Sequence, residues 1–178
     1  VYANFGVSRN VGPQIAATMP VVFTHEALRV FVDLSQVASD PDGDRVFYRV
    51  LGADNGTAAL SADGRFIVFT PEAGYTGQAS FRITADDGFN ASPEVDVPVT
   101  VSSAPLTNID FSVRRLLLDA GETQIIRIIG DFADQQDVIL PFDYVNARVL
   151  DTGVASLTPQ GLLTALADGH TVLTASRG

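Results

Sequence analysis

The sequence predicts an all-β fold of two consecutive β-sandwiches, and the prediction rests on its hydrophobic pattern. Apolar and polar residues alternate in short segments bounded by Gly, Asp, Asn and Pro, which is the pattern of half-buried strands. No segment keeps the 3.6-residue period of a helix. Roughly seven such strands precede residue 102, and that number and spacing are typical of a two-sheet sandwich.

The expected strands of the first unit place an apolar residue at every second position. Residues 28–34 are the clearest case, with apolar side chains at alternate positions from Leu28 to Leu34. The Asp63-Gly64 pair predicts a two-residue type I′ hairpin turn, which needs positive φ at both central positions. The same alternation predicts strands at 45–51, 65–70, 78–85 and 94–101.

A domain boundary is expected near residues 102–106, where a strand gives way to small residues and Pro105. Short apolar segments resume at Thr107, and one of them runs from Leu116 to Leu118. The sequence therefore predicts four parts. They are an extra N-terminal strand (1–12), a first sandwich (13–103), a linker (104–106) and a second sandwich (107–178).

The charge and composition exclude several classes of partner and site. The formal net charge of −10 argues against a nucleic-acid surface, which needs clustered basic residues. All eleven basic residues are Arg, so a Lys-to-Asn isopeptide crosslink is excluded. No apolar run reaches the length that crosses a bilayer, so membrane insertion is not expected. With no Cys, the chain has no disulfide framework and no thiol nucleophile.

The sequence predicts no catalytic residues, and we expect the chain not to be an enzyme. Its two His residues, His25 and His170, fall in different units, so neither a Ser-His-Asp set nor a His-based metal cluster is visible. The chain has no Trp, and its carboxylates have no aromatic sugar platform beside them. This pattern argues against glycoside hydrolysis.

The first unit carries motifs that resemble a known family. From about residue 12 to 103 it contains SDPDGDRVFYRV, then NGTAALSADGRFIVFTPEAGYTGQASFRITADDG, then VDVPVTV. These elements, in this order, resemble the cadherin-like Ig repeats of large bacterial surface and secreted proteins. The resemblance implies an Ig-like β-sandwich with a structural or adhesive role, at an extracellular or cell-surface location.

The second unit resembles a different family. Its AGET (120–123) and DTGVASLTPQGLLTALADGHTVLTA (151–175) segments are similar to group 2 bacterial Ig-like domains, although the usual Trp before the Val-Ala element is missing. Domains of that family continue past the Thr-Ala segment with a turn and a final strand, whereas this sequence stops at Gly178. We therefore expect two tandem Ig-like β-sandwiches, the second lacking its last strand.

The opening segment VYANFGVSRN has the alternation of a strand, with apolar residues at Val1, Ala3, Phe5 and Val7. Two interpretations are open. In one, the chain belongs to a longer array, and residues 1–10 are the last strand of a preceding domain. In the other, this assembly strand is donated into the open sheet edge of another copy, which builds a fibre.

Five Asp residues in the DPDGD and ADDG loops are candidates for a calcium site. In an Ig-type sandwich, the loops that follow the strands at 28–34 and 78–85 gather at one pole. Ca²⁺ is the expected cofactor, because it takes roughly six to eight oxygen ligands from carboxylates and carbonyls. In the alternative interpretation, these side chains only shape turns. The candidate ligands are Asp40, Asp42, Asp44, Asp86 and Asp87.

The function expected from these features is that of a structural or adhesive module of an extracellular surface or filament protein, assembled by strand donation and stiffened by calcium. The expected partners are neighbouring Ig-like domains or copies of the chain itself, with a surface glycan or receptor as a further candidate. The alternative is a carbohydrate- or receptor-binding accessory module of a secreted enzyme or phage tail. That alternative requires an exposed aromatic patch, for which Phe31 and Phe47 are the candidates.

Overall fold

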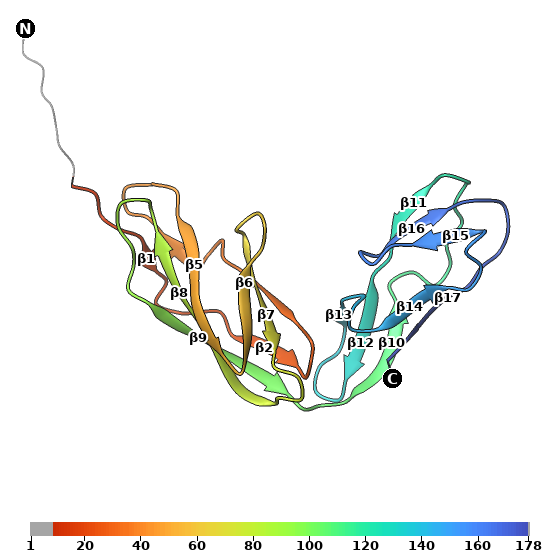
Figure 1. Ribbon diagram of the computed structural model, residues 1–178, viewed down its shortest axis with the longest axis horizontal. Coiled ribbons are helices and arrows are strands. Elements are labelled where there is room, and N and C mark those ends of the chain that lie inside the picture. Colours follow the sequence, from red (N-terminus) through yellow and green to blue (C-terminus); the bar gives the residue numbers. More distant parts are fainter. Residues whose placement is uncertain (1–8, 178) are drawn as a thin grey trace, which may run out of the picture. The chain divides into compact units, whose positions relative to one another are not determined.

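The computed structural model describes residues 9–177, which form strands, turns and irregular segments (Figure 1). The all-β prediction is confirmed. The chain divides into two compact units, residues 1–103 and residues 104–178. Within the described part, no helix is long and apolar enough to cross a membrane. The predicted assembly strand at Val1, Ala3, Phe5 and Val7 lies outside the described residues.

Unit 1 is built from nine strands within residues 9–103. They are β1 (Gln14–Ile15), β2 (Val22–His25), β3 (Val30–Asp33), β4 (Ala38–Ser39), β5 (Phe47–Asp54), β6 (Gly56–Leu60), β7 (Phe66–Pro71), β8 (Gly77–Asp86) and β9 (Val95–Ser102). One sheet has the order β2-β9-β8-β5 and the other has the order β3-β7-β6, while β1 pairs with β4. The pair β2 and β9 is parallel, and the other neighbouring pairs are antiparallel.

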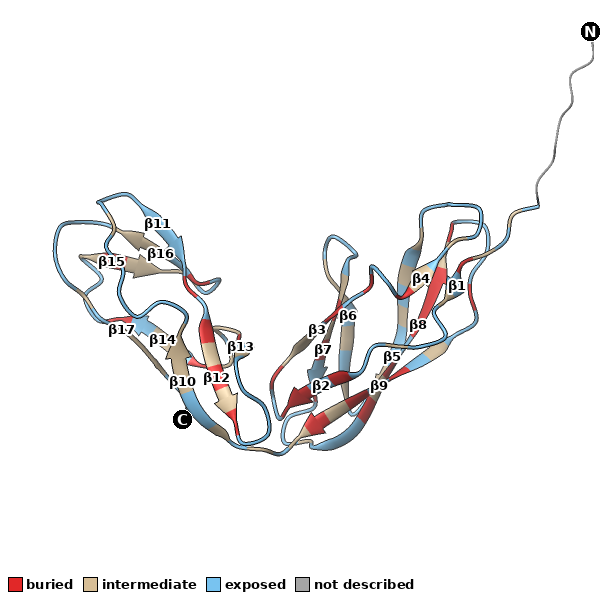
Figure 2. Cartoon of the chain, turned by 180° about the vertical axis from the view of Figure 1, so that it is seen from behind, coloured by how far each residue is buried: buried red, intermediate tan, exposed pale blue. Residues whose placement is uncertain are grey.

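The core of unit 1 lies between the two larger sheets. Alternate residues of β7, β8 and β9 point into it, as the period of a strand requires. Figure 2 colours the buried parts of β8 and β9 red. Phe69 of β7 and Phe81 of β8 meet across the core with their ring centroids 6.1 Å apart. The inward-facing side chains of these three strands are Ile67, Phe69, Ala79, Phe81, Ile83, Val97, Val99 and Val101.

The hairpin between β6 and β7 differs from the predicted type I′ turn. Gly64 has a φ of +69°, but Asp63 has no positive φ, so the turn is not of that type. The Gly64 N–H donates to the Ser61 carbonyl at 2.9 Å, and the Ser61 hydroxyl donates to the Asp63 carboxylate at 2.5 Å. These bonds form a longer loop, in which only Gly64 needs the left-handed conformation.

Tyr75 secures the corner at which the chain enters β8. Its hydroxyl donates to the Gln78 carbonyl at 2.5 Å and accepts a hydrogen bond from the Asn55 side-chain amide at 3.0 Å. Asn55, with a φ of +58°, forms the one-residue connection between β5 and β6, which belong to different sheets. Tyr75 therefore ties the corner before β8 to the point where the chain changes sheets.

Unit 2 contains eight strands within residues 104–177. They are β10 (Leu106–Phe111), β11 (Thr123–Ile125), β12 (Ile128–Phe132), β13 (Val138–Leu140), β14 (Asn146–Val149), β15 (Ala155–Leu157), β16 (Leu162–Ala165) and β17 (Leu173–Ser176). Three sheets have the orders β10-β12-β13, β11-β16-β15 and β14-β17, and every pair is antiparallel.

The strand orders of the two units correspond. The sheet β11-β16-β15 matches β3-β7-β6, the pair β14-β17 matches β5-β8, and the pair β10-β12 matches β1-β4. In unit 1, β9 lies beside β8 and β2 lies beside β9. Within residues 104–177, no strand corresponds to β9 or to β2. Within residues 104–177, β17 therefore has no neighbour in the place that β9 has beside β8.

Candidate functional site: an open groove in unit 2

The segment that follows β10 is apolar but forms no strand. Residues 113–118 occupy the place that β2 has in unit 1, between the first strand and β11. Val113 and Leu116 are exposed, and Leu117 is 95% exposed. The prediction of a strand at Leu116 to Leu118 is therefore wrong. The physical reason is the missing neighbour: β2 gains its backbone hydrogen bonds from β9, and unit 2 offers this segment no such strand among its described residues.

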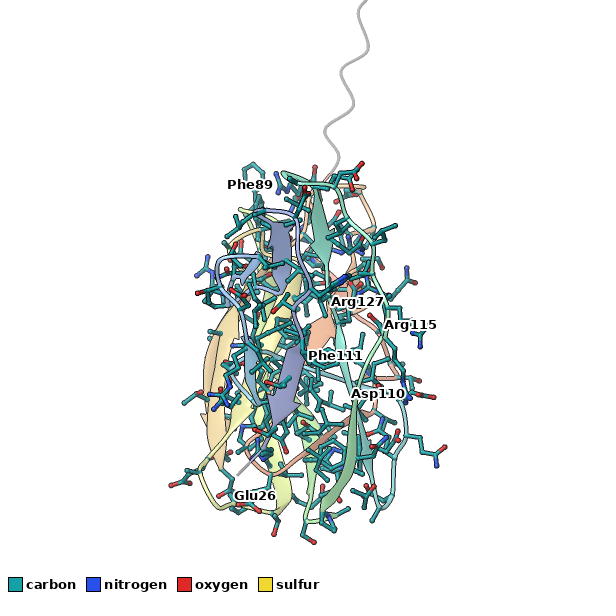
Figure 3. All side chains as sticks on the ribbon, turned by 90° about the vertical axis from the view of Figure 1, so that its right-hand side faces the viewer. Glu26, Phe89, Asp110, Phe111, Arg115 and Arg127 are labelled. Atoms are coloured by element: carbon teal, nitrogen blue, oxygen red, sulfur yellow. The ribbon has the colours of Figure 1, made fainter. Side chains whose placement is uncertain are left out.

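A groove of about 420 Å³ opens beside this exposed segment. One wall comes from residues 113–118 and the other from residues 169–173, at the start of β17. Buried Ile126 and Ala155 lie at the groove, together with half-buried Leu163. Phe111, the last residue of β10, also lines it and is labelled in Figure 3. The interior of the second sandwich is thus accessible from its edge.

A second hollow of about 540 Å³ lies at the other end of β17. It is lined by residues 106–109 of β10 and by Ser176 and Arg177. The groove borders Leu173 at the start of β17, and the hollow borders Ser176 at its end. We call the groove and the hollow together the slot.

The edge of β17 that faces away from β14 has no partner strand within residues 104–177. The opposite edge pairs with β14, from Leu173 opposite Val149 to Ser176 opposite Asn146. In unit 1 the corresponding edge of β8 pairs with β9. An open edge offers a row of backbone N–H and C=O groups to an incoming strand. The groove supplies the apolar surface that the side chains of such a strand need.

The acidic loops of unit 1 form a second candidate site, here called the acidic pole: residues 40–44 and residues 86–90. The Asp40 carboxylate accepts hydrogen bonds from the Asp42 N–H at 2.8 Å and the Asp44 N–H at 3.2 Å. Its other oxygen, Oδ2, is buried and accepts no hydrogen bond within the described part of the chain. The Asp42 and Asp44 side chains are exposed.

The second loop of the acidic pole uses its carboxylates to hold its own backbone. Asp86 accepts a hydrogen bond from the Gly88 N–H and pairs with the Arg49 guanidinium at 2.6 Å. The buried Asp87 carboxylate accepts from the Phe89 N–H at 2.7 Å and the Asn90 N–H at 2.6 Å. These are the bonds of an Asx turn.

The chain enters unit 1 through contacts with both acidic loops. The Asn10 side-chain amide donates to Asp87 at 2.8 Å, and the Val11 N–H donates to Asp42 at 2.7 Å. Because residues 10 and 11 are adjacent, the two loops lie at the same end of the unit. The bonds from Asn90 and Asn10 lower the pKa of Asp87. The stability that this ionised carboxylate contributes is complete above its unfolded pKa and is lost as the pH falls through the lower folded value.

The five Asp residues do not surround a common point. Within residues 9–177, no group of three or more His, Cys, Asp or Glu side chains is arranged to hold a metal ion. Asp86 and Asp87 are occupied by hydrogen-bond donors, and Asp42 holds the entering chain. The calcium site therefore stays a prediction.

Comparison with known families identifies unit 1. The family described as "Bacterial Ig domain" matches residues 10–100, just over half of the chain. The chain belongs to the bacterial Ig domain family. The match begins at Asn10, so the residues that hold the entering chain fall within the family domain. Whether unit 1 is of the cadherin-like kind, and whether unit 2 belongs to group 2, stay predictions.

Several solved structures are similar to this bacterial Ig chain over most of its length. Domains 5-6 of the S-layer protein SbsC have 17% identity and a TM-score of 0.45, and the match covers 94% of this chain and 91% of that one. The longer S-layer protein rSbsC(31-844) has 18% identity and a TM-score of 0.42, and the match covers 94% of this chain and 22% of that one. The endo-fucoidan hydrolase MfFcnA4_H294Q, from glycoside hydrolase family 107, has 13% identity and a TM-score of 0.42. The match covers 92% of this chain and 28% of that one. This chain thus spans less than a third of the last two. No curated protein has a sequence that matches it.

The two aromatic candidates for a ligand-binding patch are exposed but separated. Phe31 is on β3 and Phe47 is on β5, and these strands belong to the two different sheets of this bacterial Ig domain. Since both side chains point away from the core, they face outward on opposite sides of the sandwich. Each lies beneath an arginine, Arg29 and Arg45 respectively. The two phenylalanines therefore do not form one patch.

Proposed function

We propose that this chain is a structural module of an extracellular or cell-surface bacterial protein, and that its second sandwich accepts an extended strand from outside residues 104–177. Membership of the bacterial Ig domain family supports the first part. The slot along β17 supports the second and is the observation that carries the proposal, because a strand fills the corresponding place in unit 1. Such a module works mechanically, by connecting rigid sandwiches.

An added strand covers both the free backbone edge of β17 and the apolar surface of the groove. The backbone of the added strand pairs with the free N–H and C=O groups of β17. Every second side chain of that strand points into the groove, beside Ile126 and Leu163. The side chains on the other face stay in solvent, so the strand needs to be apolar only at alternate positions.

A peptide with the sequence of β9, residues 95–102, tests this proposal. Added to the chain lacking residues 1–8, it is expected to slow amide hydrogen exchange at β17 and at residues 113–118, because both become paired. A peptide carrying Val97→Asp and Val99→Asp keeps the length but loses the apolar face, and it serves as the control. Equal exchange with and without the β9 peptide would remove strand addition from the proposal.

We also propose that the acidic pole binds calcium, through the buried Asp40 Oδ2 and the exposed carboxylates of Asp42 and Asp44. Asp42 and Asp44 would have to reorient toward the ion. Ca²⁺ is expected to raise the melting temperature of unit 1 and to produce heat in a calorimetric titration, and Asp44→Asn is expected to weaken both signals. Asp119→Asn, at an exposed turn of unit 2, is the matched control. A titration with neither heat nor a change in melting temperature would rule this site out.

A further inference from the structure

We propose that unit 1 binds an anionic polysaccharide on the outer face of the sheet β3-β7-β6. This inference goes beyond the proposed function, because it concerns a face of unit 1 and does not involve the slot of unit 2. The site is a row of four apolar side chains, here called the aromatic patch, with an arginine beside each of its two rings. The four residues are Phe31, Ala59, Phe66 and Val68.

The register of the sheet places these four side chains next to one another. Phe31 of β3 is directly opposite Val68 of β7, and Val68 is directly opposite Ala59 of β6. Phe66 lies two residues before Val68 on the same face of β7, diagonal to Phe31 and within reach of an aromatic side chain. Ile67, between Phe66 and Val68, is buried in the core, so its two neighbours face outward. Figure 2 shows the three strands side by side.

The aromatic patch is accessible to a ligand. Phe31 is 55% exposed, Ala59 is exposed, and Phe66 and Val68 are half-buried. A central strand of the other sheet, β8, presents polar side chains on its outer face, which are Gln78, Ser80 and Arg82. A continuous apolar row is therefore a particular feature of the sheet β3-β7-β6, and not a general property of the surface of unit 1.

Each ring of the aromatic patch has a guanidinium group over it. The guanidinium carbon of Arg29 lies 5.8 Å from the centroid of the Phe31 ring, and that of Arg65 lies 5.1 Å from the centroid of the Phe66 ring. A guanidinium held by an aromatic ring has less freedom to lose when it binds an anion. The two arginines give this face a local positive charge in a chain whose net charge is −10.

Arg65 keeps hydrogen-bond donors for a ligand. Its side chain is 62% exposed, and within residues 9–177 its guanidinium donates one hydrogen bond, to the Asp33 carboxylate at 3.4 Å. A guanidinium carries five N–H donors, and an ion pair as exposed as this one is weak. The remaining donors match the paired oxygens of a carboxylate or a sulfate group. Asp33 is directly opposite Phe66 and provides an acceptor for sugar hydroxyl groups.

The size and chemistry of the site favour a sugar chain over a protein partner. A stable protein interface uses roughly 20–30 residues on each side, and the aromatic patch with its arginines is much smaller. The C–H groups of a pyranose ring pack on phenylalanine, because the face of the aromatic ring carries the negative part of its quadrupole. Sugar hydroxyls then bond to Asp33, and anionic substituents bond to Arg29 and Arg65. An anionic polysaccharide thus matches the apolar row, the acceptor and the two cations together.

Calorimetric titration of the full chain with polysaccharides tests the inference. The intact chain is expected to bind dextran sulfate and polygalacturonate, which carry sulfate and carboxylate groups, and not to bind neutral dextran. Phe31→Ala, Phe66→Ala and Arg65→Gln are each expected to raise the dissociation constant for dextran sulfate about tenfold. Thermal unfolding checks that each variant is folded.

Phe47→Ala is the matched control for these substitutions. Phe47 is also exposed and also lies beneath an arginine, Arg45, whose guanidinium carbon is 5.0 Å from the ring centroid. It belongs to the other sheet, where it is directly opposite Asp86. Its replacement is therefore expected to leave the binding of dextran sulfate unchanged.

Five results would overturn parts of the inference or all of it. Binding of neither anionic polysaccharide would overturn all of it, and equal binding of dextran would remove the requirement for charge. Equal binding of poly-glutamate, which has the charge but no sugar ring, would remove the sugar. Equal losses in Phe31→Ala and Phe47→Ala would show that the sheet β3-β7-β6 does not carry the site. A dimer in light scattering that Phe31→Ala abolishes would mean that a second copy covers the patch instead.

Discussion

Replacing Phe81 with Ala is expected to lower the free energy of unfolding of unit 1 by about 3–5 kcal/mol. Phe81 lies on β8 with 1% of its surface exposed, and its ring packs against Phe69 of the facing sheet. Truncation removes apolar contacts from both sheets and leaves a cavity that the strands cannot close without breaking their pairing. Guanidinium unfolding followed by circular dichroism measures the loss.

Phe47→Ala is the control for the Phe81 substitution. Phe47 lies on β5 of the same sheet, but half of its side chain is exposed and it points away from the core. Its replacement is expected to cost less than about 1 kcal/mol. Comparable losses for the two substitutions would mean that the core does not lie between these two sheets.

Replacing Gly161 with Ala is expected to destabilise unit 2 by about 2–4 kcal/mol, for two separate reasons. Gly161 has a φ of +84°, which side chains of L-residues rarely adopt. A Cβ at this position would also lie 2.5 Å from the Phe142 ring and 2.7 Å from the Ile126 carbonyl oxygen. Because the Ile126 N–H donates to the Gly161 carbonyl, the strain reaches a residue that lines the groove.

Gly121→Ala separates the two causes. Gly121 has a φ of +91°, and nothing lies within 4 Å of where its Cβ would be. Its replacement is therefore expected to carry only the cost of the backbone conformation, about 1–2 kcal/mol. Thermal unfolding of both variants measures the difference between their losses of stability. Equal losses would show that the contact with Phe142 relaxes without cost.

The candidate groove could be predicted only in part. The resemblance of residues 151–175 to group 2 domains led us to expect an open sheet edge in unit 2. The opposite wall of the slot was missed, because Leu116 to Leu118 has the composition of a strand and was predicted as one. Whether such a segment becomes a strand depends on a neighbour to which its backbone can bond, and that neighbour is far away in the sequence.

The sequence by itself determined the strands β3, β5, β7, β8 and β9 of unit 1, because a side-chain period of two leaves one face of each strand apolar and so decides which residues are buried. Ile67, Phe69, Phe81 and Ile83 follow this rule. Only the tertiary structure decided what depends on distant partners. It placed Phe31 and Phe47 on different sheets, and it joined Asp42 and Asp87 to the entering chain instead of to each other. Alternation is a local property of the sequence, whereas the pairing of edges and the meeting of loops depend on the path of the whole chain.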